Sequence, residues 1–273
     1  MTDRPSQIRR LVLVLDPDGA GEAGLRWTGE LARLLDLQVL ALMIEDERLF
    51  HAAGHGFASE IAPDRATRQA LDPARLDSDF RLAARRSERR LREIARAARL
   101  AVEVQRVRGS PEMTIRERIR HGDLAALFAP SSPLDRTFGS HAARLRLAEG
   151  LQAALMMPPS PTVQAGTVVA VPGDAEDAAP VALGQGIAGR AGADLEIWSP
   201  GACVPKVGMP QDATVRDLDP ITTATVRAPR DRPVPRVMIL GAALTPDRRR
   251  RLHALASRLG APVISLGPAR QET

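Results

Sequence analysis

The chain opens with two hydrophobic segments of strand length, separated by a turn and an amphipathic segment. Residues 8–15 (IRRLVLVL) and 38–44 (QVLALMI) are nearly continuous apolar runs, which is typical of strands buried on both faces of a parallel sheet. Between them, a turn over residues 16–19 precedes apolar residues at helical spacing over 22–35. This order predicts a βαβ unit with a right-handed crossover.

The alternation of helical and strand patterns continues to residue 157. Residues 45–76 are polar and lack a strong period, so we interpret them as an irregular segment with a short helix near the start. Residues 77–100 predict a helix, and 102–107 alternate as in a strand near a sheet edge. The remaining predicted elements are a helix at 111–120, a strand at 124–129, a helix at 140–151 and a strand at 153–157.

After a proline-rich stretch the same pattern starts again. Pro158, Pro159 and Pro161 interrupt both helix and central strand, so residues 158–165 are interpreted as a linker. The elements predicted beyond it are strands at 167–171, 194–198, 214–218, 223–226, 237–241 and 262–266 and helices at 178–191 and 246–259. The sequence therefore predicts two tandem α/β domains, 1–157 and 166–273, of which the second is shortened in its middle.

Composition narrows the class of protein and of partner. Hydrophobic residues make up 44% and charged residues 26%, which are ordinary values for a globular protein. Aromatic residues are only 3%, with no Tyr, which argues against a protein that stacks nucleic-acid bases on rings. Apolar runs of strand length and the absence of a signal-peptide pattern lead us to expect a cytoplasmic protein without a membrane span.

The charge pattern leaves one alternative open. Lys and Arg number 38 against 33 Asp and Glu, a net charge of +5. Arginines gather over residues 80–100 and 248–251, which is typical of the solvated face of an amphipathic helix. The alternative is a face that docks an acidic protein partner. Neither interpretation implies sequence-specific binding of nucleic acid.

Several segments together resemble the universal stress protein domain. These are the strand that ends in Asp16, the turn with Gly19 and Gly21, the helix GLRWTGELARLLDL, the strand QVLALMIED, and the run VRGSPEMTIRERIRHGDLAALFAP with the later pair Gly139-Ser140. The resemblance covers residues 8–157 and, more weakly, 166–267. It implies two tandem units, each a mostly parallel sheet flanked by helices. It also implies self-association through the last strands, either inside one chain or in a homodimer.

Some members of that family bind ATP at the carboxyl ends of the strands, through a Gly-x2-Gly-x9-Gly-(Ser/Thr) loop. Glycines let the backbone approach phosphates, which free N–H groups then hold. The loop spacing requires glycines ten and thirteen residues before Gly139, but these positions are Ala129 and Ala126. In addition, Pro130 and Pro133 cannot donate an N–H. We therefore expect no cofactor, with ATP or AMP as the alternative. The residues that the resemblance places near a nucleotide are Asp16, Gly109, Ser131, Ser132, Gly139 and Ser140.

Other motifs have ordinary explanations. Asp16 is also a turn-forming residue, and Gly109 suits a tight strand-to-helix turn. His51 and His55 lie four residues apart near Glu47, but no metal-binding pattern surrounds them, so we expect solvated loop histidines. The run from Gly184 to Gly189 imitates a dinucleotide fingerprint inside a helical stretch, where packing of small residues explains it better.

These observations lead to one functional expectation and two alternatives. We expect a binding and regulatory protein of the stress response, without catalytic or metal-ligating residues and with a degenerate nucleotide site. The first alternative is an ATP- or AMP-binding switch or weak ATPase in the first half. The second alternative is an interaction module that uses its Arg-rich helix.

Overall fold

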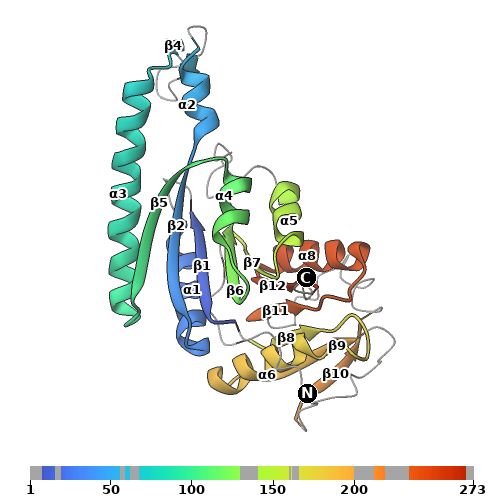
Figure 1. Cartoon of the computed structure of the whole chain (residues 1–273). Coiled ribbons are helices and arrows are strands. Elements are labelled where there is room, and N and C mark those ends of the chain that lie inside the picture. The colour runs from blue at the N-terminus through green and yellow to red at the C-terminus, as the bar shows by residue number, and fades with distance from the viewer. Residues whose placement is uncertain are drawn as a thin grey trace.

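The structure is a computed structural model, which describes residues 8–15, 20–55, 59–61, 68–129, 141–159, 161, 166–199, 212–218 and 234–268. Within these residues, one large sheet has the strand order β10-β9-β8-β11-β12-β7-β6-β1-β2-β5 (Figure 1). Its strands are β1 (Arg10–Leu15), β2 (Gln38–Asp46), β5 (Val102–Gly109), β6 (Asp123–Phe128), β7 (Ala153–Met157), β8 (Val168–Val171), β9 (Leu195–Ser199), β10 (Thr214–Asp217), β11 (Val237–Leu240) and β12 (Val263–Leu266).

Helices cover both faces of this sheet. They are α1 (Glu22–Leu35), α2 (Glu47–Ala53), α3 (Pro73–Ala97), α4 (Pro111–Arg118), α5 (His141–Glu149), α6 (Ala179–Ala191) and α8 (Pro246–Leu259). One core cluster joins alternate sheet residues to α1, α3 and α6. The other joins the opposite face to α4, α5 and α8. The mixed α/β fold with a mostly parallel sheet is therefore confirmed.

The sheet consists of two halves with the same strand order. We call residues 8–157 the first unit and residues 166–268 the second unit. The first unit runs β5-β2-β1-β6-β7 and the second β10-β9-β8-β11-β12, and all strand pairs inside each half are parallel. The last strands, β7 and β12, pair antiparallel with Leu155 opposite Ile264. The two halves thus form one continuous sheet inside a single chain.

Contacts beside the β7–β12 pair also join the units. α1 packs against α6. Arg190 donates from Nη1 to the Leu34 carbonyl oxygen at 2.6 Å, and Arg236 forms an ion pair with Glu30. Because the strands of the two units run in opposite directions at the junction, the carboxyl ends of the first unit's strands lie at the opposite edge of the sheet from those of the second unit.

The segment before α3 is more ordered than its composition suggested. α2 confirms the expected short helix, and β3 (Ser59–Ile61) and β4 (Arg68–Ala70) form a small antiparallel hairpin. α3 begins four residues earlier than expected, because Asp72 accepts the Ala74 N–H at 3.0 Å and Pro73 fits the first helical position. Figure 1 shows that α3 extends beyond the sheet with α2 and the hairpin at its end.

Candidate functional site

Ligands bind to open parallel α/β sheets at the carboxyl ends of two neighbouring strands whose connections leave in opposite directions. In the first unit these strands are β1 and β6, and in the second they are β8 and β11. Each unit thus has one such position. The side chains found there decide what the unit can bind.

The position in the first unit is partly filled by the chain's own side chains. A Cβ placed on Gly24, in the first turn of α1, would lie 3.1 Å from ring carbons of Phe128 and 3.3 Å from Met157 Cγ. Arg144 is only 6% exposed, and its Nη1 donates to the Phe128 carbonyl oxygen at 2.6 Å. The Phe128 ring therefore fills the space between the end of β6 and α1, and the Arg144 guanidinium of α5 binds the last carbonyl oxygen of β6.

An arginine holds the same place in the second unit. Arg249 is the fourth residue of α8, as Arg144 is the fourth residue of α5. Its Nη2 donates to the Gly241 carbonyl oxygen at 2.7 Å and its Nη1 to that of Leu266 at 3.2 Å. Burial lowers the pKa of the Arg249 guanidinium below its ordinary value, although it remains charged at neutral pH. This matched pair has no short sequence motif and was not anticipated.

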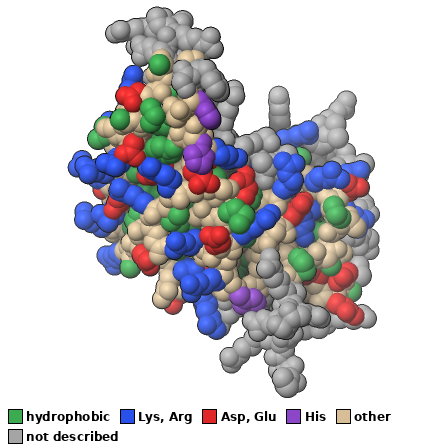
Figure 2. Space-filling model, turned by 45° about the horizontal axis from the view of Figure 1, so that its top comes forward, with side chains coloured by type: hydrophobic (Ala, Val, Ile, Leu, Met, Phe, Trp, Pro, Cys, Tyr) green, Lys and Arg blue, Asp and Glu red, His purple; other side chains and the backbone are tan. Residues whose placement is uncertain are grey.

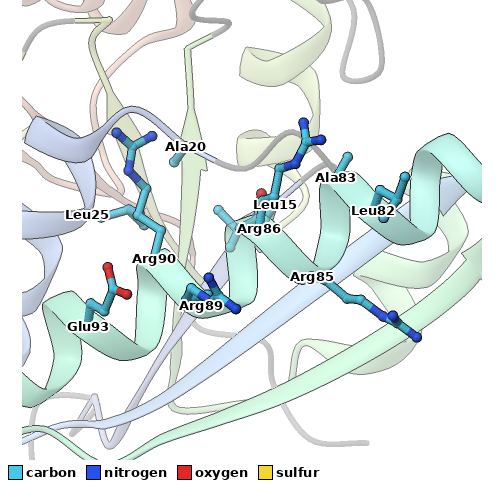
Figure 3. A pocket seen from close by; sticks show the side chains of 11 residues that line it. Leu15, Ala20, Leu25, Leu82, Ala83, Arg85, Arg86, Arg89, Arg90 and Glu93 are labelled. Carbon is cyan, nitrogen blue, oxygen red and sulfur yellow. The ribbon is translucent and has the colours of Figure 1, made fainter.

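A cavity of about 590 Å³ lies between α3 and the carboxyl end of β1 (Figure 3). This volume is within the range of small-molecule sites. Its lining residues are Leu15, Ala20, Leu25, Leu82, Ala83, Arg85, Arg86, Ser87, Arg89, Arg90 and Glu93. The floor is apolar, since Leu15, Ala20 and Leu25 are all buried.

The rim of this cavity is strongly basic. Figure 3 shows Arg86 and Arg90 extending toward the side of Ala20 and Leu25, while Arg85 points away. Arg90 lies 3.4 Å from Glu22. Arg26 and then Arg90 lower the pKa of the Glu22 carboxyl below its ordinary value.

The charge on the rim is largely uncompensated. Within the described residues, the structure shows no ion pair for Arg85, Arg86 or Arg89. Figure 2 shows basic side chains gathered along the edge of the molecule where α3 lies. We call Arg85, Arg86, Arg89 and Arg90 the arginine rim.

The sequence-predicted site residues fall mostly outside the described part of the chain. Asp16, Ser131, Ser132, Gly139 and Ser140 all lie there. Gly109 is described, and it ends β5 opposite Asp46 of β2, two strands from β1. A Cβ on it would lie 3.1 Å from Thr114 Oγ1 at the start of α4. This tight strand-to-helix turn explains Gly109 without a ligand.

The other motifs have structural explanations. Gly184 faces the sheet, where a Cβ would lie 3.0 Å from Leu195 Cδ1, whereas Gly186 and Gly189 face open space. Packing therefore explains the first glycine of the imitated fingerprint. Among the described residues, no group of three or more His, Cys, Asp or Glu side chains is placed to hold a metal ion. None of the described helices is both long and apolar enough to span a membrane.

Comparison with known proteins shows likeness at the level of fold. No family profile matches the chain, and no curated protein matches it either. A universal stress protein from Archaeoglobus fulgidus DSM 4304 superimposes with a TM-score of 0.57 at 12% identity, over 96% of this chain and 97% of that chain. A putative universal stress protein from Pseudomonas aeruginosa UCBPP-PA14 gives 0.51 at 15% identity, over 97% and 95%.

A functionally unknown protein from Pseudomonas aeruginosa PAO1 gives a TM-score of 0.50 at 14% identity, over 96% of this chain and 94% of that chain. At such identities the likeness concerns architecture alone. The protein therefore has the fold of the universal stress proteins.

Proposed function

We propose that the protein is a binding and regulatory protein of the stress response, active in the cytoplasm, that works without catalysis and has lost its nucleotide site. The fold similar to universal stress proteins supports the stress-response part of this proposal. The loss of the nucleotide site is supported by what lies at the carboxyl end of β6. The observation that carries the proposal is the packing of Phe128 and Arg144 at that end.

The glycine spacing leads to the same conclusion. Ala126, where the family loop would have its first glycine, is fully buried inside β6 between Leu13 of β1 and Leu155 of β7. A strand residue at the centre of a sheet has its N–H in the ladder and cannot turn it toward a phosphate. The phosphate oxygens of a nucleotide would lose a backbone donor there.

Calorimetric titration with ATP and AMP tests this function. We expect no binding heat up to millimolar nucleotide, and native mass spectrometry of the freshly purified protein should show no bound adenosine phosphate. Micromolar ATP binding would overturn the proposal in favour of an ATP-dependent switch or weak ATPase. If binding occurs, a bulky residue in place of Gly139 should abolish labelling by an ATP analogue, which would locate the nucleotide.

The arginine rim supports a second candidate function, the docking of an acidic protein partner. Three of its four arginines, Arg85, Arg86 and Arg89, show no acidic partner among the described residues. Clustered guanidinium groups attract a polyanion, and salt weakens such attraction. Capture on an immobilised polyglutamate peptide at stepped salt concentrations tests this function. Charge reversal of the four rim arginines to Glu should abolish capture. The matched control reverses four other arginines of α3, Arg75, Arg81, Arg92 and Arg96, and should retain most of it; equal loss in both variants would reject the rim.

A further inference from the structure

The second unit holds a carboxylate at the position where the first unit has none. Asp177 lies two residues before the first residue of α6, and Ala20 lies two residues before the first residue of α1. Ala20 is buried against the cavity under the arginine rim. Asp177 instead reaches across the carboxyl edge of β8 and β11.

The Asp177 carboxylate is bound by two backbone N–H groups from different loops. Its Oδ2 accepts the N–H of Gly173, after β8, at 3.0 Å and that of Ala243, after β11, at 3.4 Å. These loops flank the position at which open α/β sheets bind ligands. Convergent backbone N–H groups at such a position form an anion site.

Two glycines make room for this arrangement. A Cβ on Gly173 would clash with the backbone of Ala243 and Leu244, so only glycine lets the loops touch. A Cβ on Gly241 would clash with the Asp177 carboxylate itself. The carboxylate therefore lies in a space that exists because Gly241 has no side chain.

A half-buried positive charge completes the environment. The Arg249 guanidinium caps the carbonyl oxygens of Gly241 and Leu266 beside this space. Burial lowers the pKa of the Arg249 guanidinium, and the negative charges of Glu149 and, less strongly, Asp177 offset part of this effect. Donors, space and charge all favour one small oxyanion.

We propose that the second unit contains an oxyanion-binding site, formed by the Gly173 and Ala243 N–H groups beside Arg249, and that the Asp177 carboxylate occupies it as a ligand built into the chain. The chemical class of free ligand that fits the site is a small carboxylate or phosphate group. Such a ligand enters only when Asp177 leaves. The inference concerns the second unit alone and does not depend on the proposed function.

Chemical rescue of Asp177→Ala tests the proposal in the full-length chain. The probes are formate and inorganic phosphate, compared with chloride at equal ionic strength. Thermal unfolding should show that both oxyanions raise the Tm of the variant saturably, by about 2–4 °C over chloride, because a ligand that binds only the native state stabilises it. The wild-type Tm should show no saturable difference between the salts.

Two matched variants separate this site from a general salt effect. Asp174→Ala removes another carboxylate of the same turn, which accepts the N–H groups of Glu176 and Asp177 at 2.9 Å each. It should lose stability without an oxyanion response. The double variant Asp177→Ala with Gly241→Ala puts a methyl group where the carboxylate was, and should lose the response of the single variant.

The proposal stays testable even if Asp177→Ala is too unstable to fold in chloride. If Asp177→Ala does not fold in chloride, refolding in formate or phosphate must restore the native circular dichroism spectrum. A failure of both oxyanions to restore it would overturn the proposal. So would an oxyanion effect on Asp177→Ala no larger than that on Asp174→Ala. The oxyanion-dependent Tm shift and refolding of Asp177→Ala do not depend on whether the first unit binds a nucleotide, so this proposal and the proposed function can fail independently.

Discussion

The two units share a strand order but differ at their carboxyl edges. The first unit has Ala20 beside an open, arginine-lined cavity of about 590 Å³. The second has Asp177 bound to the N–H groups of Gly173 and Ala243. Both residues stand two positions before a helix, and the second unit has a carboxylate there where the first unit has a methyl group. The second unit thus bridges the loops after β8 and β11 with one of its own carboxylates.

The units also differ where β6 and β11 begin. Asp123, the first residue of β6, accepts two hydrogen bonds from Arg10 of the neighbouring strand. Arg236 stands just before β11 and pairs with Glu30 of α1, in the other unit. The Asp123 carboxylate is thus paired within its own unit, whereas the Arg236 guanidinium is paired across the junction with the first unit. Charges of opposite sign therefore stand near the starts of β6 and β11, strands that hold the same place in the strand order of the two units.

The largest expected effect comes from breaking the junction that the units share. Leu155 is fully buried in β7, so Leu155→Ala should lower the free energy of unfolding by about 2–5 kcal/mol. Each unit has one tryptophan, Trp27 and Trp198, and fluorescence of single-tryptophan variants in urea reports each unit separately. Both transitions should shift together. Val104→Ala at the sheet edge is the control and should cost about 1 kcal/mol or less; a shift in only one tryptophan would mean that the units unfold independently.

Much of this architecture could be predicted because buried parallel strands have a distinctive pattern. The runs VLVL in β1 and LALMI in β2 are apolar without interruption, and each was recognisable within a residue or two. The hairpin β3–β4 was missed because three-residue strands are too short for a period to show. The start of α3 carried a usable signal, the Asp72-Pro73 cap, which a search for apolar spacing overlooked.

The second effect concerns the internal charge pair of the first unit. Asp123 is 5% exposed and also accepts the Arg120 N–H at 2.8 Å. Asp123→Asn leaves the Arg10 guanidinium without its carboxylate and should cost about 1–3 kcal/mol. Glu30→Gln, at the pair across the junction, should cost less than about 1 kcal/mol, because the Glu30 side chain is 29% exposed against 5% for Asp123. Urea unfolding of the two variants gives this order, and a reversal would show that the junction pair is the stronger of the two.

The sites at the carboxyl edges of the sheet could not be derived from the sequence. Asp177 lies in the loop GDAED, where nothing local distinguishes it from Asp174; only the contact with Ala243, 66 positions away, sets it apart. Arg144 and Arg249 likewise act on carbonyl oxygens brought to them by the sheet. The arginine rim was visible as a cluster, but its relation to the end of β1 depends on how α3 packs. Sequence patterns report local periodicity, whereas these sites depend on loops meeting at a sheet edge.

A smaller effect distinguishes two glycines of α6. Gly184→Ala places a methyl group 3.3 Å from the Ala170 Cβ and 3.0 Å from Leu195 Cδ1, and should lower stability by about 1 kcal/mol. Gly186→Ala meets open space and should raise stability by about 0.5–1 kcal/mol, because alanine favours the helix. Thermal denaturation of both variants compares them directly. Equal effects would show that α6 does not pack on the sheet through Gly184.

The smallest expected effect is confined to the first unit and depends on pH. Arg108 donates to Asp77 of α3 at 2.5 Å and to Glu45 at 2.9 Å, and its hydrogen bond lowers the pKa of the Asp77 carboxyl from the ordinary 3.8. A lowered carboxyl pKa stabilises the fold above the unfolded value, and this contribution is lost as the pH falls through the folded value. Amide exchange in the first turns of α3, corrected for its intrinsic pH dependence, should therefore accelerate below about pH 3.8. Arg108→Gln should show the faster exchange already at pH 6. An unchanged pH profile in that variant would show that amide exchange in the first turns of α3 does not depend on the Arg108–Asp77 ion pair.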